Sequence, residues 1–284
     1  MKQKNIDFPD CWEEVKPLEW IHLLKSRYKL MIKPGIDLLD VKREWCAYVL
    51  RNRGYRFKVK TDDMLLVNGL ADTLDWMWKV DEDSGEIILV YDSTVNLIPE
   101  WTVLRGPLSH GADLTFGEFR HAVALMNTYN ETKEEVHLRA LCGTLYRSSG
   151  KKVGKADFDG CYREEFHPGR MDLYITRVRM MPEWVMWGIY AWFAYFCQYL
   201  IEGIFIIEGK EICFAPVFER KRKDDSGTGS INQDLGMHTI LFSVAESGIF
   251  GNVADTDNEL LLQVMMKLLD DKQRADELLN RNKK

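Results

Sequence analysis

The sequence lacks the patterns that identify a secreted or disulfide-rich protein. Its six cysteines are widely spaced, without any C-x-x-C pair, and the first fifteen residues contain no apolar segment of the kind found in a secretory signal. These two absences favour free thiols, mostly buried as small apolar side chains, in a reducing compartment. We therefore expect a cytoplasmic protein.

The sequence also lacks the common signatures of metal binding and catalysis. The six histidines are isolated, and there is no H-E-x-x-H, G-x-S-x-G, G-x-G-x-x-G or EF-hand pattern. Metal sites and nucleophilic sites need several such groups at fixed spacing. We expect no cofactor, no metal site and no catalytic residue, and an enzyme is the less favoured class.

One enzymatic alternative stays open in the loop 148–170. Cys161 and His167 are a nucleophile and a base six residues apart, and Glu164 with Glu165 is a pair of carboxylates. Groups of these types can serve as nucleophile, general base or general acid when a fold brings them together. A site assembled around this loop is the alternative function.

An excess of positive charge is also missing. The net charge is −6, which gives no electrostatic case for nucleic acid as a partner. The charge is unevenly spread: residues 1–60 carry 14 Lys and Arg against 8 Asp and Glu, whereas residues 61–131 carry 3 against 13. Such an asymmetry allows attraction within the fold or between subunits of a homo-oligomer, but ordinary solvated surfaces are the favoured explanation.

What is present is a set of helix signals, clearest in residues 113–147. Thr115 followed by Glu118 predicts a capping box, in which the Thr hydroxyl accepts a backbone N–H and the Glu carboxylate reaches back. The same motif occurs twice more, at Thr132 with Glu135 and at Thr256 with Glu259. We expect two helices joined by a hinge at Asn130-Glu131, and a last helix that begins near Thr256.

Apolar spacing and turn residues divide the remainder into short elements. Further helices are expected over 9–32, 37–53, 62–75 and 235–247, the second with Asp37 as its N-cap and Gly54 just after its end. Strands are expected at 55–60, in a hairpin over 76–92 around Gly85, and in short runs within 203–218.

The stretch Trp184–Ile201 contains 18 residues without a charge. Its length suits a membrane span, but its aromatic side chains run through the whole stretch and Gln198 lies within it. We expect a buried central helix, with a subunit-interface helix or a membrane-associated segment over 184–207 as the alternatives.

The predicted fold is therefore α+β and mostly α, a helical core packed around this central aromatic helix with a small β-hairpin and short strands. Helix content should exceed about 45%, against roughly a third for an average domain. We expect two domains: residues 1–103, with the hairpin, and residues 104–284, with the aromatic helix and a flexible loop at 220–234.

Two places are candidates for partner binding. The loop 220–234 begins with a basic run, and the last helix has an apolar front half followed by a charged end that we expect to project. The candidate residues are Leu261, Met265, Met266 and Leu269 in the helix and Arg220, Lys221 and Arg222 in the loop.

Several motifs together resemble those of a protein family. They are CWEEVKPLEWIHLL at 11–24, DLTFGEFRHA at 113–122, LRALCGTLYR at 138–147, and GMHTILFSVAESGIFG at 236–251 followed by TDN. This combination resembles morphogenesis proteins of tailed phages and prophages that are loosely similar to tail assembly chaperones. The motifs cover about a third of the chain. Apart from the motif at 11–24, the N-terminal hundred residues and the hairpin have no named counterpart in the family.

The resemblance implies a non-enzymatic structural or tail-assembly protein that acts by protein–protein contacts in the host cytosol or in the virion. Its partners would be other phage structural proteins, such as a tape-measure protein, with no nucleic acid and no membrane involved.

Overall fold

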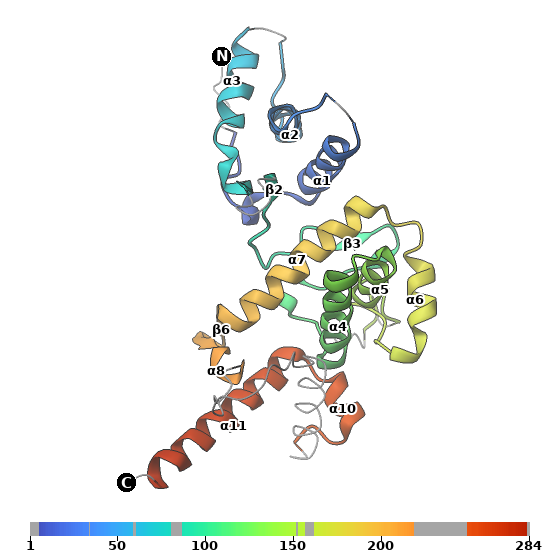
Figure 1. The fold of residues 1–284 in the computed structure, drawn as a ribbon, viewed down its shortest axis with the longest axis vertical. Helices are drawn as coiled ribbons and strands as arrows, with labels where there is room; N and C mark the ends of the chain where they lie inside the picture. The colour runs from blue at the N-terminus through green and yellow to red at the C-terminus, as the bar shows by residue number, and fades with distance from the viewer. Residues whose placement is uncertain are drawn as a thin grey trace. The chain divides into compact units, whose positions relative to one another are not determined.

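The computed structural model gives a mostly helical protein with a few short antiparallel strand pairs (Figure 1). It describes residues 6–33, 35–58, 61–80, 87–151, 153–156, 162–218 and 249–282. Among these residues 61% are helical, which confirms the predicted fold class. The helix expected over 235–247 and the loop 220–234 lie outside the described residues.

The chain divides into two compact units. Unit 1 consists of Met1–Pro99 and Met181–Trp192, and unit 2 consists of Glu100–Met180 and Phe193–Lys284. From the sequence we predicted one boundary, after residue 103, with the whole aromatic helix in the second domain. In the structure that helix, α7 (Glu183–Glu202), supplies its first half to unit 1 and its second half to unit 2.

Unit 1 contains three helices and a two-stranded sheet besides its part of α7. The helices and 3-10 turns are η1 (Trp12–Glu14), α1 (Pro17–Ile32), α2 (Leu38–Asn52), α3 (Thr61–Ala71) and η2 (Leu74–Met77). The predicted hairpin is formed by β1 (Trp78–Val80) and β2 (Ile87–Leu89), which pair antiparallel with Trp78 opposite Leu89.

An aromatic cluster forms the core of unit 1. Trp12 and Trp20 are both 1% exposed, and their ring centroids lie 4.9 Å apart at an interplanar angle of 78°. Tyr91 lies 4.9 Å from each of them. Edge-on aromatic pairs of this kind add about 0.5–1.5 kcal/mol each beyond their buried area. The core therefore joins η1, α1 and the segment that follows β2.

The predicted ends of α2 are confirmed. The carboxylate of Asp37 accepts the backbone N–H of Asp40 at 2.8 Å, and Gly54 has a φ of +90°. The strand expected at 55–60 is wrong for its described part, residues 55–58. There the backbone N–H of Lys58 donates to the carboxylate of Asp63 in α3 at 2.6 Å. That N–H is therefore not available for a hydrogen bond to a neighbouring strand.

A buried histidine in unit 1 predicts how that unit responds to acid. Nε2 of His22 is buried without a hydrogen-bond partner among the described residues, and the ring stacks on Tyr48 at 3.9 Å. Burial lowers the pKa of His22, the charges of Lys29, Lys25 and Arg51 lower it further, and Glu44 only partly opposes them. The folded state therefore binds a proton less readily than the unfolded chain does.

Since the unfolded state takes up more protons, unit 1 should lose stability as the pH falls below about 6.5. We expect the urea midpoint of unit 1 to fall between pH 7.5 and pH 5.5, and His22→Gln to reduce that change. The control is His167→Gln, which alters an exposed histidine of unit 2 and should leave the profile unchanged. An unaltered profile in His22→Gln would contradict the assignment.

Unit 2 is built from helices with two small sheets. Its helices and 3-10 turns are η3 (Ser109–Gly111), α4 (Phe116–Thr132), α5 (Glu135–Leu145), η4 (Pro168–Arg170), α6 (Met171–Arg177), the second half of α7, α8 (Ala215–Phe218), α10 (Val253–Asn258) and α11 (Leu261–Asn282). The strands are β3 (Glu100–Trp101), β4 (Leu104–Arg105) and β5 (Arg147–Ser148), in the order β3-β4-β5, and a separate hairpin of β6 (Ile204–Ile207) and β7 (Lys210–Cys213).

Only half of the first predicted capping box forms. The hydroxyl of Thr115 accepts the backbone N–H of Glu118 at 3.3 Å, but the Glu118 side chain does not reach back to the N-cap. The second box is wrong. Thr132 is the last residue of α4, its hydroxyl donates to a carbonyl of its own helix, and Lys133 ends the helix with a left-handed φ of 58°.

The third predicted capping box is also wrong. Asn252 caps the short helix α10 by accepting the backbone N–H groups of Ala254 and Asp255 at 2.8 and 3.1 Å. Thr256 lies inside α10 and is buried, and Glu259 follows the end of that helix. The last helix, α11, begins at Leu261 instead.

The aromatic helix α7 is buried as predicted. Its inward side chains include Val185, Ile189 and Trp192 in unit 1 and Phe193 and Phe196 in unit 2, each at most 2% exposed. Within the part of the chain that the structure describes, no helix has the length and apolarity needed to cross a membrane.

Candidate functional site

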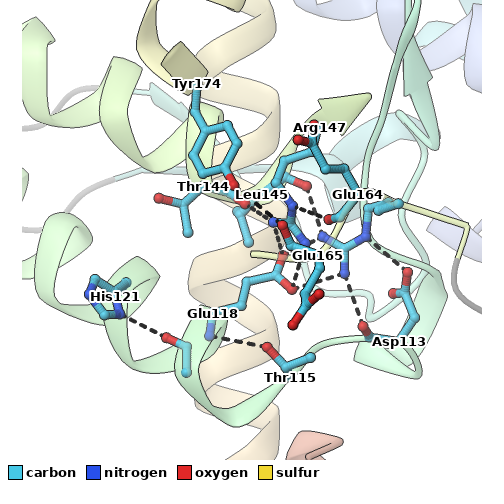
Figure 2. A network of polar contacts seen from close by, with 12 residues as sticks. Asp113, Thr115, Glu118, His121, Thr144, Leu145, Arg147, Glu164, Glu165 and Tyr174 are labelled. Carbon is cyan, nitrogen blue, oxygen red and sulfur yellow. Dashed lines mark hydrogen bonds and ion pairs between the residues drawn. The ribbon is translucent and has the colours of Figure 1, made fainter. Parts of the chain in front are cut away.

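The described part of unit 2 contains a buried cluster of charged side chains at the first turn of α4 (Figure 2). Its centre is Glu118, which is 0% exposed. Its carboxylate accepts hydrogen bonds from two guanidinium groups, those of Arg147 and Arg163. The residue that the sequence predicted as half of a capping box is therefore the centre of an ion cluster.

Arg147 enters the cluster from the start of β5, two residues after α5 ends. Its Nη1 and Nη2 donate to the two oxygens of Glu118 at 3.0 and 3.2 Å, and its Nε donates to the carbonyl of Glu164 at 2.7 Å. Nη1 also donates to the carbonyl of Thr144, near the end of α5. Arg147 thus joins α4, α5 and the following loop.

The second arginine, Arg163, belongs to the loop 148–170. All five of its N–H donors are used. Nε donates to Asp113 at 2.9 Å, Nη1 donates to Glu118 and to the carbonyl of Leu145, and Nη2 donates to Glu118 and to the carbonyl of Asp113. Ser149 pairs with Arg163 in an isolated β-bridge, which fixes this part of the loop against the end of β5.

The charges of the cluster balance, with two carboxylates and two guanidiniums. Burial by itself raises the pKa of Glu118, but the charges and hydrogen bonds of Arg147 and Arg163 outweigh it, so the pKa lies below its usual value. For Arg163, burial lowers the pKa, while Glu118 and Asp113 more than reverse that effect and raise it. The cluster therefore favours the charged forms of Glu118 and Arg163.

The geometry makes this cluster an internal brace rather than a binding site. A ligand anion would have to displace Glu118 or Asp113 from Arg163, because every donor of that side chain already has a protein partner. Arg147 has its guanidinium over the ring of Phe166, 5.5 Å from the ring centroid. The cluster holds α4, α5, β5 and the loop together.

The residues of the enzymatic alternative are not brought together as a catalytic group. Cys161 lies outside the described residues. The oxygens of Glu164 are bound by Arg170 at 3.1 Å and Arg177 at 2.5 Å. Glu165 and His167 lie 3.7 Å apart, with side chains 61% and 46% exposed. In the described part of this loop, the carboxylates serve surface ion pairs.

One group with metal-ligand chemistry was missed in the sequence. Asp10, Cys11 and Glu14 offer ligand atoms within 4.8 Å of one another, at the surface of unit 1. Burial raises the pKa of the Cys11 thiol, the backbone N–H of Glu14 partly offsets that rise, and the Glu13 side chain and the Glu14 charge add to it. A raised thiol pKa disfavours the thiolate that binds metals. Asp10 and Glu14 are exposed, and the Glu14 carboxylate accepts the backbone N–H of Asp10 at 3.3 Å.

The predicted partner-binding residues fall into three groups. Leu261 and Met265 are 0% and 3% exposed and pack inside unit 2, whereas Met266 is 37% exposed and Leu269 is half-buried. Arg220, Lys221 and Arg222 lie outside the described residues. The exposed apolar side chains of α11 that the sequence analysis did not single out are Leu278 and Leu279, at 60% and 42%.

Comparison of the chain with protein-family models, curated proteins and solved structures found no significant match.

Proposed function

We propose that the chain is a non-enzymatic phage or prophage structural or tail-assembly protein, with a chaperone-like role, that acts through protein–protein contacts. Support from the sequence is the resemblance of its motifs to phage morphogenesis proteins. Support from the structure is one observation: the distal half of α11 is a helix that presents apolar side chains to solvent.

The two halves of α11 differ in burial. Leu261, Val264 and Met265 are at most 3% exposed, and the helix packs against α4 and α8. Beyond Met265, none of the described side chains of the helix is buried. Leu278 and Leu279, exposed beyond the packed part of the helix, are suited to contact a groove on another protein.

Ion pairs within the helix contribute to the stability of its distal half, where tertiary packing is sparse. Lys267 pairs with Asp271, and Arg274 pairs with Asp270 at 2.9 Å, both at i,i+4 spacing. Each such pair stabilises a helix by about 0.2–0.5 kcal/mol. Leu278 and Leu279 are therefore presented on a preformed helix, which lowers the entropy cost of binding. The partner we propose is a tape-measure-like or other virion protein.

The test is co-purification from cells that carry the native gene neighbourhood, followed by mass spectrometry. The wild-type chain should bring down a virion protein in stoichiometric amount, and Leu278→Glu combined with Leu279→Glu should reduce that yield at least about tenfold, because charges would enter the apolar contact. The double variant should fold normally, since both changed side chains are exposed.

The matched control is Met180→Glu, which changes an 82% exposed apolar side chain of unit 2 outside α11. It should retain the partner. A wild-type chain that purifies alone would contradict the assembly role. A double variant that retains the full yield would contradict the role of α11.

A further inference from the structure

The hairpin β6–β7 follows α7 directly (Figure 1). The side chains of β6 alternate between a buried and an exposed face. Phe205 is buried, with its ring 5.2 Å from Tyr199 and 5.4 Å from Phe214. Successive side chains of a strand point to opposite faces. Ile204 and Ile206 accordingly occupy the other face, where they are 53% and 76% exposed.

The turn of this hairpin determines which backbone groups face outward. Its two central residues, Glu208 and Gly209, have φ values of 51° and 75°, as in a two-residue type I′ turn. In such a hairpin the flanking pair, Ile207 with Lys210, exchanges both hydrogen bonds, and opposite pairs then alternate. The N–H and C=O groups of Ile204 and Ile206 therefore point away from β7.

Among the described strands, only β7 pairs with β6, so no described strand covers the outer edge of β6. The carbonyl of Ile204 accepts the hydroxyl of Tyr199 at 2.7 Å, while the outward N–H and C=O of Ile206 have no partner among the described residues. Natural proteins protect such edges with charged side chains, proline or bulges. The strand Ile204–Ile207 has none of these, whereas β7 carries Lys210 and Glu211.

We propose that the outer edge of β6 binds an extended apolar segment of a partner protein by strand addition. The backbone of Ile206 would pair with the segment, and Ile204 and Ile206 would contact its side chains. The surrounding charge is negative, because Glu202, Glu208 and Glu211 are all exposed and Lys210 is the only basic residue of the hairpin. The segment should therefore carry lysine or arginine at its ends.

A second copy of the chain fits this edge less well. Antiparallel pairing of two β6 edges would place Ile204 opposite Ile206 of the other copy, because these residues carry the outward groups. In that register the end of α7 in one copy, with Glu202, would approach the turn of the other copy, with Glu208, and these like charges would repel each other. The occupant is thus a different segment with basic ends. This proposal stands on different residues from the role of α11.

The probe is a fluorescent peptide with eight residues of alternating valine and threonine, flanked at each end by two lysines. Its counterpart has two glutamates at each end in place of the lysines. By fluorescence anisotropy with the full chain, the lysine peptide should bind at least about tenfold more tightly than the glutamate peptide. Ile206→Pro, which removes the outward N–H donor, should weaken the lysine peptide about tenfold, whereas Ile206→Val should keep its affinity within about twofold.

A second variant guards against a folding defect in Ile206→Pro. Glu211→Lys keeps the backbone intact and should reduce the preference for the lysine peptide. The proposal is overturned if neither peptide binds at concentrations up to about 1 mM, a weak limit for strand addition, or if both peptides bind equally. It is also overturned if the wild-type chain is a dimer and the Ile206→Pro variant is a monomer, because the edge would then bind a second copy. The variant that combines Leu278→Glu with Leu279→Glu should bind the lysine peptide normally. That result would distinguish binding at the edge of β6 from binding at α11.

Discussion

Replacing Glu118 by glutamine is expected to lower the free energy of unfolding of unit 2 by about 3–5 kcal/mol. The side chain is fully buried and accepts hydrogen bonds from two guanidiniums, each with a side chain only 3% exposed. Glutamine keeps the size of the side chain but removes its charge and replaces one acceptor oxygen by a donor. Asp113 would then be the carboxylate that remains in the cluster, and it accepts from Arg163 and from the backbone N–H of Leu108.

The measurement is urea unfolding, followed by a probe that reports unit 2. Glu131→Gln is the matched control, because it makes the same chemical change at an exposed position of the same helix, and it should cost less than about 0.5 kcal/mol. If Glu118→Gln lowered the free energy of unfolding by less than about 1 kcal/mol, the cluster would not be a major source of stability for unit 2.

The same cluster predicts a response to acid. Because the pKa of Glu118 is lowered in the folded state, its contribution is fully present above the unfolded value near 4.3 and is lost as the pH falls through the folded value. The wild type should therefore lose stability below about pH 4.5 more steeply than Glu118→Gln does.

The cluster also shows which part of the candidate site could be predicted from the sequence. The sequence identified Glu118 as a notable residue, because Thr115 marks the first turn of α4. The role predicted for its side chain, closing a capping box, was wrong. Its partners Arg147 and Arg163 lie 29 and 45 residues away in the sequence. A capping motif is local and can be recognised in a short window, whereas a buried ion pair depends on which loop packs against the helix.

Helix ends show the same limit. Asp37 and Gly54 were predicted correctly, since a break in apolar spacing coincides with each signal. Thr132 and Thr256 have the same motif spacing but lie within helices, where their hydroxyls donate to carbonyls one turn earlier. The pattern of Thr followed by Glu fits a helix interior as well as a helix start. Burial of α7 was predictable from its composition, but its division between two units was not.

The second large effect concerns Gly111, where alanine is expected to cost about 2–4 kcal/mol. Gly111 has a φ of +65°, which L-amino acids adopt at a cost. A Cβ atom there would lie 2.3 Å from Cζ of Phe196. That ring cannot move aside easily, because it is fully buried with Phe119 and Phe193 at centroid distances of 6.3 and 6.5 Å.

Gly154 separates the two causes of this loss. It also lies in unit 2 and has a φ of +79°, but a Cβ there would meet nothing within 4 Å. Gly154→Ala should therefore cost only the conformational term, about 1 kcal/mol. The excess loss in Gly111→Ala, measured by urea unfolding of both variants, is the cost of displacing Phe196 from the core. Equal losses in the two variants would mean that the ring repacks freely and that the second half of α7 is not tightly held in unit 2.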